Sequence, residues 1–173
     1  MNTSGDKRDW EDLATLDPLW AILSYADTQF GRWNLDSFFR TGEDQIAAVI
    51  DKARHLGYPI KWESALDFGC GVGRLTRALA SYFEHSCGVD ISETMVVKAR
   101  ELNQAFSNCM FTLNDRGDLQ IFDDNHFDLI YSAITLQHIS KRQVRESFIR
   151  EFVRILKEGG LLVFQLPSHT ILI

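Results

Sequence analysis

The sequence predicts an α/β fold in which helices cover both faces of one parallel sheet. Three observations lead to this prediction. Short apolar runs alternate with segments of helical periodicity from Trp62 onward, which is typical of a sheet with parallel neighbours. A turn with glycine at alternate positions, from Gly69 to Gly73, joins the first strand to a helix. Polar or acidic residues end the successive strands, where such sheets bind their ligands.

The first 60 residues predict a helical extension before the alternating part, which spans residues 61–173. The stretch from Met1 to Thr15 is polar and acidic and predicts a loose arm. Asp17, followed by proline, predicts the start of a short helix. A capping box at Thr41 and Asp44 predicts a further helix that ends at Gly57.

Three of the four tryptophans lie in this extension, together with several phenylalanines. They are open to two interpretations: a lid or substrate wall over a bound ligand, or a set of core residues that pack the helices onto the sheet. We favour packing, because large aromatic side chains are mostly core residues, and both interpretations can hold for different residues.

The alternating part predicts right-handed crossovers and a parallel sheet that is covered on both faces. Ser92 is the expected cap of the helix after the second strand, and Ser140 with Gln143 forms a capping box for a helix that ends at Gly159-Gly160. The expected strands are one that ends at Phe68, His85 to Val89, Met110 to Leu113, Phe127 to Ser132, and Leu161 to Leu166.

The composition is that of an ordinary globular domain, with 173 residues, 45% hydrophobic and 24% charged. No apolar run approaches the roughly 18 residues needed to cross a bilayer, so we expect a cytoplasmic protein without membrane contact. The net charge of -6 argues against nucleic acid as a partner. Cys70, Cys87 and Cys109 fit no zinc spacing, so we expect small buried residues and no metal.

The spacing of residues in the glycine turn distinguishes between the possible kinds of nucleotide-binding site. A dinucleotide fingerprint needs a small residue where Arg74 or Thr76 stands, so an NAD-type oxidoreductase is disfavoured. A P-loop needs Gly-Lys-Ser/Thr, which is not present. The pattern is instead Asp67, one residue, and then G-x-G-x-G.

This pattern resembles the first motif of class I S-adenosylmethionine (SAM)-dependent methyltransferases, which have a Rossmann-like fold. Further stretches at the right distances resemble the same family, and the likeness extends over most of Trp62 to Pro167. The stretches are Phe127-Asp128-Leu129-Ile130, Leu136-Gln137-His138-Ile139, and Arg154 to Gly160, in which Glu158 replaces the usual proline.

The resemblance implies a binding site for SAM, and for its product S-adenosylhomocysteine, at the carboxyl ends of the strands. It places Asp90 on the ribose hydroxyls, and Ile91 against the adenine. Asp115 is expected to accept the adenine amino group, with Asp118 as its rival, and the backbone of Arg116 to meet the ring. Around the methionine part and the end of strand four the resemblance implies Asp67, Gly69, Cys70, Gly71, Gly73, Arg74 and Ser132.

His138 is the histidine that this interpretation places near the site. It is either a general base for an acceptor proton or a hydrogen-bonding loop residue, and we favour the second role because the sulfonium is already activated. Tyr131-Ser132-Ala133-Ile134 lacks the N-P-P-Y pattern of methyltransferases that act on bases or amides. The sequence therefore favours in-line methyl transfer to a small-molecule acceptor.

The chain ends almost directly after the fifth strand, at Ser168 to Ile173. Class I sheets usually continue with a sixth and a seventh strand. The resemblance therefore implies five strands in the order 3-2-1-4-5, and we expect a truncated chain or a fragment. The exposed fifth strand then invites pairing, for example in a homodimer. A SAM-binding module without turnover is the alternative to an active enzyme.

Overall fold

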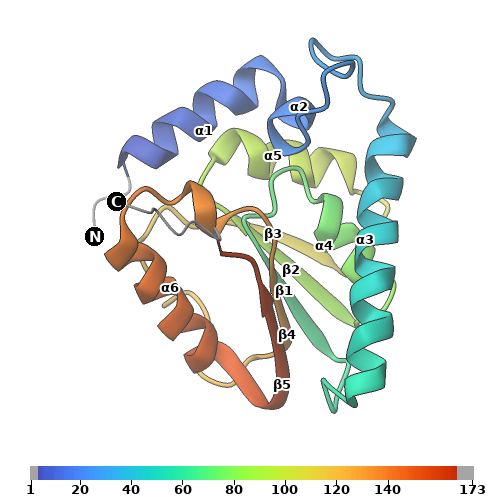
Figure 1. Ribbon diagram of the computed structural model, residues 1–173, viewed down its shortest axis with the longest axis vertical. Helices are drawn as coiled ribbons and strands as arrows, with labels where there is room; N and C mark the ends of the chain where they lie inside the picture. Colours follow the sequence, from blue (N-terminus) through green and yellow to red (C-terminus); the bar gives the residue numbers. More distant parts are fainter. Residues whose placement is uncertain (1–3, 167–173) are drawn as a thin grey trace, which may run out of the picture.

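The computed structural model describes residues 4–166 and contains a five-stranded parallel sheet. Its order is β3-β2-β1-β4-β5, as predicted, so β3 and β5 form the two edges (Figure 1). The segment from Ser168 to Ile173, which the sequence analysis placed after the fifth strand, lies outside the described residues. The strands are β1 Ser64–Phe68, β2 His85–Asp90, β3 Cys109–Leu113, β4 Phe127–Ser132 and β5 Leu156–Phe164.

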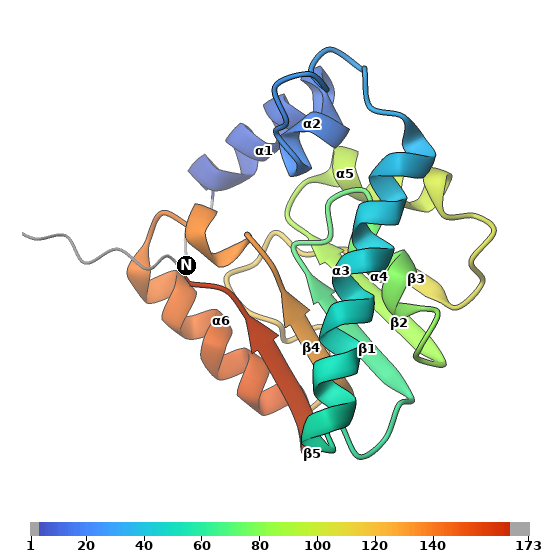
Figure 2. The ribbon, with the colours of Figure 1, turned by 45° about the vertical axis from the view of Figure 1, so that its right-hand side comes forward.

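Helices cover both faces of the sheet, with α3, α4 and α5 on one face and α6 on the other (Figure 2). Two further helices, α1 and α2, lie above the carboxyl ends of the strands (Figure 1). The helices are α1 Ser4–Leu16, α2 Pro18–Ile22, α3 Leu35–Leu56, α4 Arg74–Leu79, α5 Glu93–Leu102 and α6 Arg142–Ile155, with a 3-10 turn η1 at Leu136–His138.

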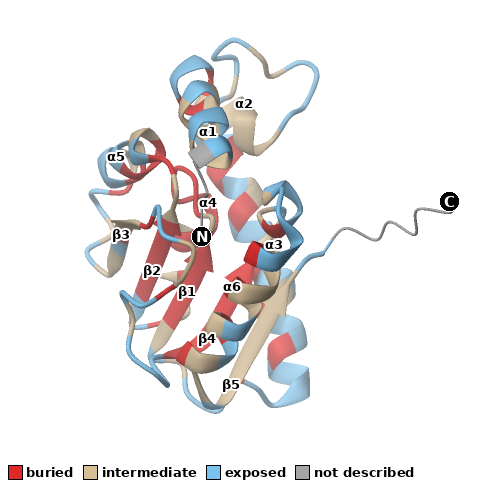
Figure 3. Ribbon diagram, turned by 90° about the vertical axis from the view of Figure 1, so that its left-hand side faces the viewer, coloured by how far each residue is buried: buried red, intermediate tan, exposed pale blue. Residues whose placement is uncertain are grey.

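The central strands carry the core because side chains of a strand alternate between the two faces. Leu66 and Phe68 of β1 pack with Phe152 of α6, whereas Ala65 packs with Ile46 of α3 on the opposite face. Figure 3 shows β1 and β2 as mostly buried and the edge strand β5 as half-buried.

The N-terminal segment is helical over Ser4–Leu16, so the prediction of a loose arm is wrong for the described residues. One side of α1 is apolar, and Ala14 is fully buried in a cluster with Val72 and Met95. Trp10 packs against this cluster. The helix is therefore stabilised by tertiary contacts with the turn after β1 and with α5, which a local pattern does not reveal.

Helix α3 begins at Leu35, so the predicted start at Thr41 is wrong. Asn34 is the N-cap, and its side chain accepts a hydrogen bond from the Ser37 N–H at 2.9 Å. The Thr41 hydroxyl instead donates to the carbonyl of Phe38 at 2.6 Å, inside the helix. The predicted end at Gly57 is confirmed, since this glycine has a φ of 74° in the left-handed region.

The predicted boundaries of α6 are wrong at both ends. The helix is preceded by Lys141, without a side-chain cap, so Ser140 and Gln143 form no capping box. The helix ends at Ile155, and β5 continues through Gly159. The glycine lies where β5 shifts its register against β4, with a φ of 74°, and Ile60 packs where a Cβ would stand.

The other two predicted helix caps are confirmed. Asp17 accepts a hydrogen bond from the Trp20 N–H at 3.2 Å, and Ser92 accepts one from the Met95 N–H at 3.1 Å. Among the helices within residues 4–166, none combines the length and the apolar character that crossing a bilayer requires.

Candidate functional site

A cavity opens at the carboxyl edge of the sheet, where α1 crosses above the strand ends (Figure 1). Its floor comes from the ends of β1 and β2 and from the segments after β3 and β4, and α1 and α2 close it from above. Most of its lining is apolar. The polar and charged residues that border it are Asp6, Arg74, Asp90, Asn114, Arg116, Thr135 and His138.

The glycine turn passes directly beneath this cavity, which Gly69, Cys70 and Gly71 line. Gly69, Gly71 and Gly73 all have positive φ, at 79°, 52° and 84°. At Gly71 an added Cβ would lie 2.5 Å from the Cδ1 of Ile22, so only glycine lets α2 approach the turn. The glycines thereby let the main chain approach the cavity, although the N–H groups of Gly69, Gly71 and Gly73 already donate to partners within the protein.

Asp90 connects the glycine turn to the start of α5. Its Oδ2 accepts a hydrogen bond from the Gly71 N–H at 2.8 Å, and its Oδ1 accepts one from the Ser92 N–H at 2.9 Å. Burial raises the pKa of this carboxyl group, while the backbone hydrogen bonds oppose that rise. Asp90 and its neighbour Ile91 both line the cavity, as the sequence predicted for the second strand end.

Asp67 lies behind the turn instead of in the cavity lining. It is almost fully buried, and its Oδ2 accepts a hydrogen bond from the Thr76 hydroxyl at 2.7 Å. Desolvation raises the pKa of Asp67 to about 6 against the opposing effects of Thr76 and of Arg74. The residue is placed to support the turn from below.

Cys70 lines the cavity through the turn itself. Its thiol donates to the carbonyl of Gly71 at 3.5 Å, and burial raises the pKa of the thiol well above its ordinary value. A neutral thiol is a weak nucleophile, so Cys70 acts through its place in the turn.

At the end of β3, Asn114 and Arg116 line the cavity, whereas Asp115 points to Lys7 of α1. The Asp115 Oδ2 and the Lys7 Nζ are 2.8 Å apart. Asn114 is mostly buried and donates from Nδ2 to the carbonyl of Asp118 at 2.7 Å. The sequence prediction missed Asn114, although it is the first polar residue after the strand.

The end of β4 is held by buried hydrogen bonds. Ser132 is buried and donates to the carbonyl of Phe68 at 3.3 Å, so it braces β1 and does not line the cavity. Beyond it, Ile134 has a φ of 66°, which is unusual for a β-branched residue. Ile134 and Thr135 border the cavity.

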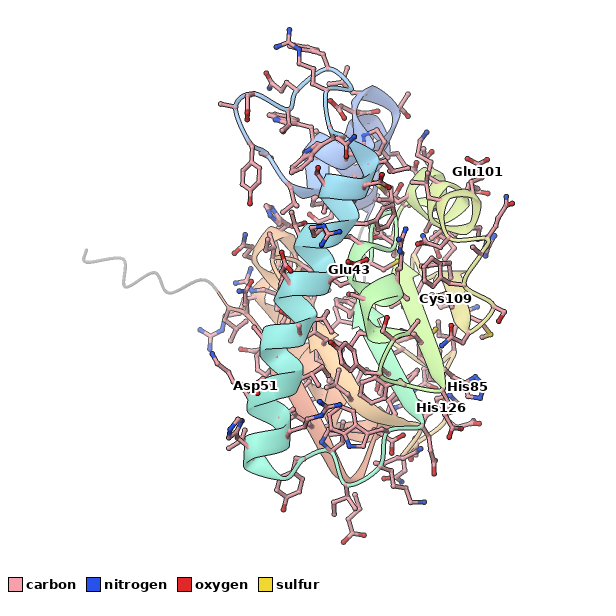
Figure 4. The ribbon with its side chains drawn as sticks, turned by 90° about the vertical axis from the view of Figure 1, so that its right-hand side faces the viewer. Glu43, Asp51, His85, Glu101, Cys109 and His126 are labelled. Atoms are coloured by element: carbon pink, nitrogen blue, oxygen red, sulfur yellow. The ribbon has the colours of Figure 1, made fainter. Side chains whose placement is uncertain are left out.

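His138 in η1 faces α1 across the cavity. Its ring lies edge-on to Trp10, with the ring centres 5.4 Å apart, and the histidine is exposed. His85 and His126 lie at the opposite end of the sheet from α1 (Figure 4). Of the histidines within residues 4–166, only His138 lines the cavity.

Trp10 and Asp6 are cavity residues that the sequence analysis missed, because it predicted a loose arm there. The signal was present as apolar residues at helical spacing, namely Trp10, Leu13 and Ala14. The other aromatic residues of the extension include Trp33, which packs against Phe38 with ring centres 5.5 Å apart. The packing interpretation therefore describes Trp33, whereas the lid interpretation stays a prediction for Trp10.

The fold is a doubly wound α/β sheet, and its cavity lies at the carboxyl ends of the strands, where the strand order reverses and where such sheets bind ligands. The family model described as a methyltransferase domain matches residues 66–164, more than half of the chain. The chain belongs to this methyltransferase family, and the resemblance to class I SAM-dependent methyltransferases is confirmed. SAM is the cofactor of this class.

Two relatives illustrate the range of the family. Phosphoethanolamine N-methyltransferase 1 of Zea mays is 30% identical over 84% of this chain, and tocopherol O-methyltransferase of Arabidopsis thaliana is 33% identical over 73%. The aligned parts are 29% and 38% of those proteins, so this chain spans about a third of their length.

Solved structures show the same fold. PH0226 protein from Pyrococcus horikoshii is 29% identical with a TM-score of 0.63, and the match covers 84% of this chain and 64% of that chain. Phosphoethanolamine N-methyltransferase 1 of Haemonchus contortus, solved with phosphoethanolamine and S-adenosylhomocysteine, is 18% identical with a TM-score of 0.67. That match covers 98% of this chain and 34% of the nematode protein.

Proposed function

We propose that this chain binds SAM at the carboxyl edge of its sheet and transfers the methyl group to a small-molecule acceptor by in-line displacement. One observation carries the proposal: the glycine turn, Asp90 and the end of β3 border a single cavity. Family membership supports SAM as the ligand, because this class uses that cofactor.

The adenosine part of SAM is assigned to the Asp90 side of the cavity. Each Asp90 oxygen accepts one backbone hydrogen bond and keeps further lone pairs, so the carboxylate can also accept from two vicinal ribose hydroxyls. Ile91 and Arg116 then border the adenine. Asp115 stays the predicted acceptor of the adenine amino group, provided that it turns away from Lys7, and Asn114 lies closer to the cavity.

The methionine part of SAM is assigned to the glycine turn. Its ammonium and sulfonium are cations, and the Asp67 carboxylate behind the turn favours positive charge there. Asp67 does not line the cavity, so it acts by holding Thr76 at the start of α4 and through its electric field. Ser132 supports the same turn by bracing the end of β1.

The acceptor is assigned to the space beneath α1, between Trp10 and the segment that holds Ile134, His138 and Ile139. This lining is partly apolar, which suits a partly apolar small molecule. Two relatives are named as methyltransferases of phosphoethanolamine and of tocopherol, and these names support a small-molecule acceptor without identifying the compound. In-line positioning in such a pocket can supply roughly 7–11 kcal/mol of the barrier.

His138 has two roles compatible with its position. It can take a proton from an acceptor hydroxyl or amine, or it can hold the acceptor by a hydrogen bond. The edge-on contact with Trp10 supports the holding role, because it keeps the ring in the wall of the cavity.

Calorimetric titration with S-adenosylhomocysteine tests the proposal, with NADH as the competing ligand. We expect micromolar binding of S-adenosylhomocysteine and no binding of NADH. Asp90→Ala should abolish the binding, because it removes both the ribose acceptor and the hydrogen bond to the Gly71 N–H. Asp123→Ala, on an exposed loop, is the matched control and should bind like the wild type.

A folded wild-type chain that binds neither ligand, or binds NADH more tightly, would contradict the proposal. The alternative is a SAM-binding module without turnover. Incubation with SAM labelled in the methyl group and a panel of amine and phenol acceptors separates the two: binding without any labelled product supports the module.

The remaining expectations belong to the same proposal. We propose that residues 1–60 are a helical extension or lid, and that residues 61–173 are the SAM-binding core. We further propose a cytoplasmic protein that pairs through the exposed edge of β5. Sedimentation of the chain over a range of concentrations tests the pairing.

A further inference from the structure

The chain takes a strained path directly after β4. Ile134 has a φ of 66°, in the left-handed region that disfavours a β-branched residue. Within residues 4–166, the other residues of the cavity lining with positive φ are Gly69 and Gly71, which carry no side chain. Because glycine adopts this conformation without strain, the backbone alone does not explain why isoleucine stands here.

Gln165, the first residue after β5, holds this conformation from outside the cavity lining. β5 lies beside β4 (Figure 2), and the Gln165 N–H donates to the carbonyl of Ser132 at 3.0 Å, next to the last pair of the two strands. The Oε1 of the same Gln165 accepts a hydrogen bond from the Ile134 N–H at 2.9 Å. One residue thus fixes the chain on both sides of Ala133.

The bend at Ile134 brings the next residue onto the glycine turn. The Thr135 side chain packs so closely on Gly69 that a Cβ there would overlap its Oγ1 and Cγ2. The Thr135 hydroxyl donates to the carbonyl of Ala133 at 3.1 Å, across the bend. Ile134 and Thr135 therefore form a wall of the cavity that adjoins the glycine turn, the assigned place of the methionine part.

We propose that Ile134 is a specificity-determining residue, whose side chain limits the size of the group that can lie next to the cofactor sulfur, and that Gln165 is its positioning residue. This inference rests on the proposed function. The acceptor is assigned to the space that Ile134 borders, and an apolar side chain on a backbone held by hydrogen bonds excludes bulky groups from that space. Its removal should admit larger groups while the cofactor binds as before.

The test measures binding, so it needs no known acceptor. Two stable analogues of SAM have a tertiary amine in place of the sulfonium, and the nitrogen carries either a methyl or a benzyl group. Calorimetry gives the ratio of their dissociation constants, with S-adenosylhomocysteine as the reference ligand. In Ile134→Ala and Ile134→Gly we expect the preference for the methyl analogue to fall by about 10-fold or more, with the affinity for S-adenosylhomocysteine unchanged.

The two substitutions also separate the side chain from the strain. Both remove the isoleucine side chain, but only glycine adopts a φ of 66° without strain, so Ile134→Gly should unfold at a higher urea concentration than Ile134→Ala. Phe30→Gly is the matched control, since Phe30 has a φ of 61° and does not line the cavity. It should keep the wild-type ratio of the two analogues.

Gln165→Leu and Gln165→Glu test the positioning role. Leucine removes the acceptor of the Ile134 N–H, so the preference for the methyl analogue should fall, by a smaller factor than in Ile134→Ala. Glutamate keeps an oxygen that can accept this hydrogen bond and should retain the wild-type preference. If Gln165→Leu also kept the wild-type ratio, the positioning role would be wrong.

The outcomes for Ile134 are separate from those for the proposed function. An unchanged ratio in both Ile134 variants, or an equal loss of affinity for S-adenosylhomocysteine and both analogues, would overturn the specificity role. A folded wild-type chain that binds none of the three ligands would instead contradict the proposed function, and the specificity role with it.

Discussion

At the residue scale, Asp67 is the group whose ionisation should be visible in the stability of the protein. The carboxyl group is buried beneath the glycine turn, and its pKa is raised from 3.8 to about 6. Between these two values the folded chain keeps a proton that the unfolded chain has lost. The contribution of Asp67 to the free energy of unfolding therefore falls as the pH rises through this window and is constant above it.

Asp67→Asn removes this titration while keeping an oxygen that can accept from the Thr76 hydroxyl. We expect the variant to gain stability relative to the wild type as the pH rises from about 4 to about 6, by up to about 3 kcal/mol. Urea unfolding of both proteins at a series of pH values measures the difference. Asp51→Asn, at an exposed position on α3, is the control and should show no such trend.

If the difference in free energy of unfolding between Asp67→Asn and the wild type did not change across this pH range, the raised pKa of Asp67 would be contradicted. Asp90 is also buried, and its charge contributes to the raised pKa of Asp67. The difference between the two proteins therefore measures the titration of Asp67 together with its coupling to Asp90.

At the scale of the element, α1 is attached to the ends of several strands at once. Lys7 pairs with Asp115 after β3, and Glu11 accepts hydrogen bonds from the backbone N–H groups of Glu93 and Thr94 at the start of α5. The N–H of Ser140 donates to Asp6 at 3.4 Å. These contacts hold the helix over the cavity, although each one contributes little free energy by itself.

The double variant Lys7→Ala with Glu11→Ala should loosen α1 without unfolding the sheet. An exposed ion pair and a helix-capping carboxylate together contribute about 1–2 kcal/mol, so opening of α1 should become roughly tenfold more frequent. Hydrogen exchange followed by mass spectrometry measures this as faster exchange in α1 alone.

The matched control is Arg8→Ala with Asp12→Ala, which changes the same two charges at exposed positions of α1. It should leave the exchange rates close to those of the wild type. Equal acceleration in both double variants would mean that helix propensity, and not attachment to the strand ends, determines the order of α1.

At the scale of the whole molecule, the packing on the two faces of β1 joins the helices into one cooperative unit. Phe152 of α6 is fully buried and lies 5.0 Å from Phe68, measured between ring centres. Phe68 belongs to the strand whose other face packs against α3. A loss of packing on one face of the sheet should therefore lower the stability that probes on the other face report.

Phe152→Ala should lower the free energy of unfolding by about 3–5 kcal/mol, because it leaves a cavity in the core. Val153→Ala, the next residue and 64% exposed, should change it by no more than about 0.5 kcal/mol. Urea unfolding followed by circular dichroism and by tryptophan fluorescence provides the measurement. Separate midpoints for the two probes would contradict a single cooperative unit.

The strand ends and the cofactor-binding turn could be predicted because they depend on local patterns, whereas the strand order was predicted from the resemblance to class I methyltransferases. Strand ends at Phe68, Asp90 and Ser132 follow from apolar runs that stop at a polar residue or a glycine. Capping at Asp17 and Ser92 depends on residues within one turn. The caps predicted at Thr41 and Ser140 have the same local pattern and are wrong, since the helices begin elsewhere.

The sequence by itself therefore determined the class of fold, the strand order, the glycine turn and the set of strand ends at which the site lies. Only the tertiary structure decided that residues 4–16 form a helix over the cavity, that Asn114 and Trp10 line it, and that Arg74 is held by α3. The physical reason is the range of the interactions: periodicity and turns act within a few residues, whereas α1 and Arg74 are stabilised by partners distant in the chain.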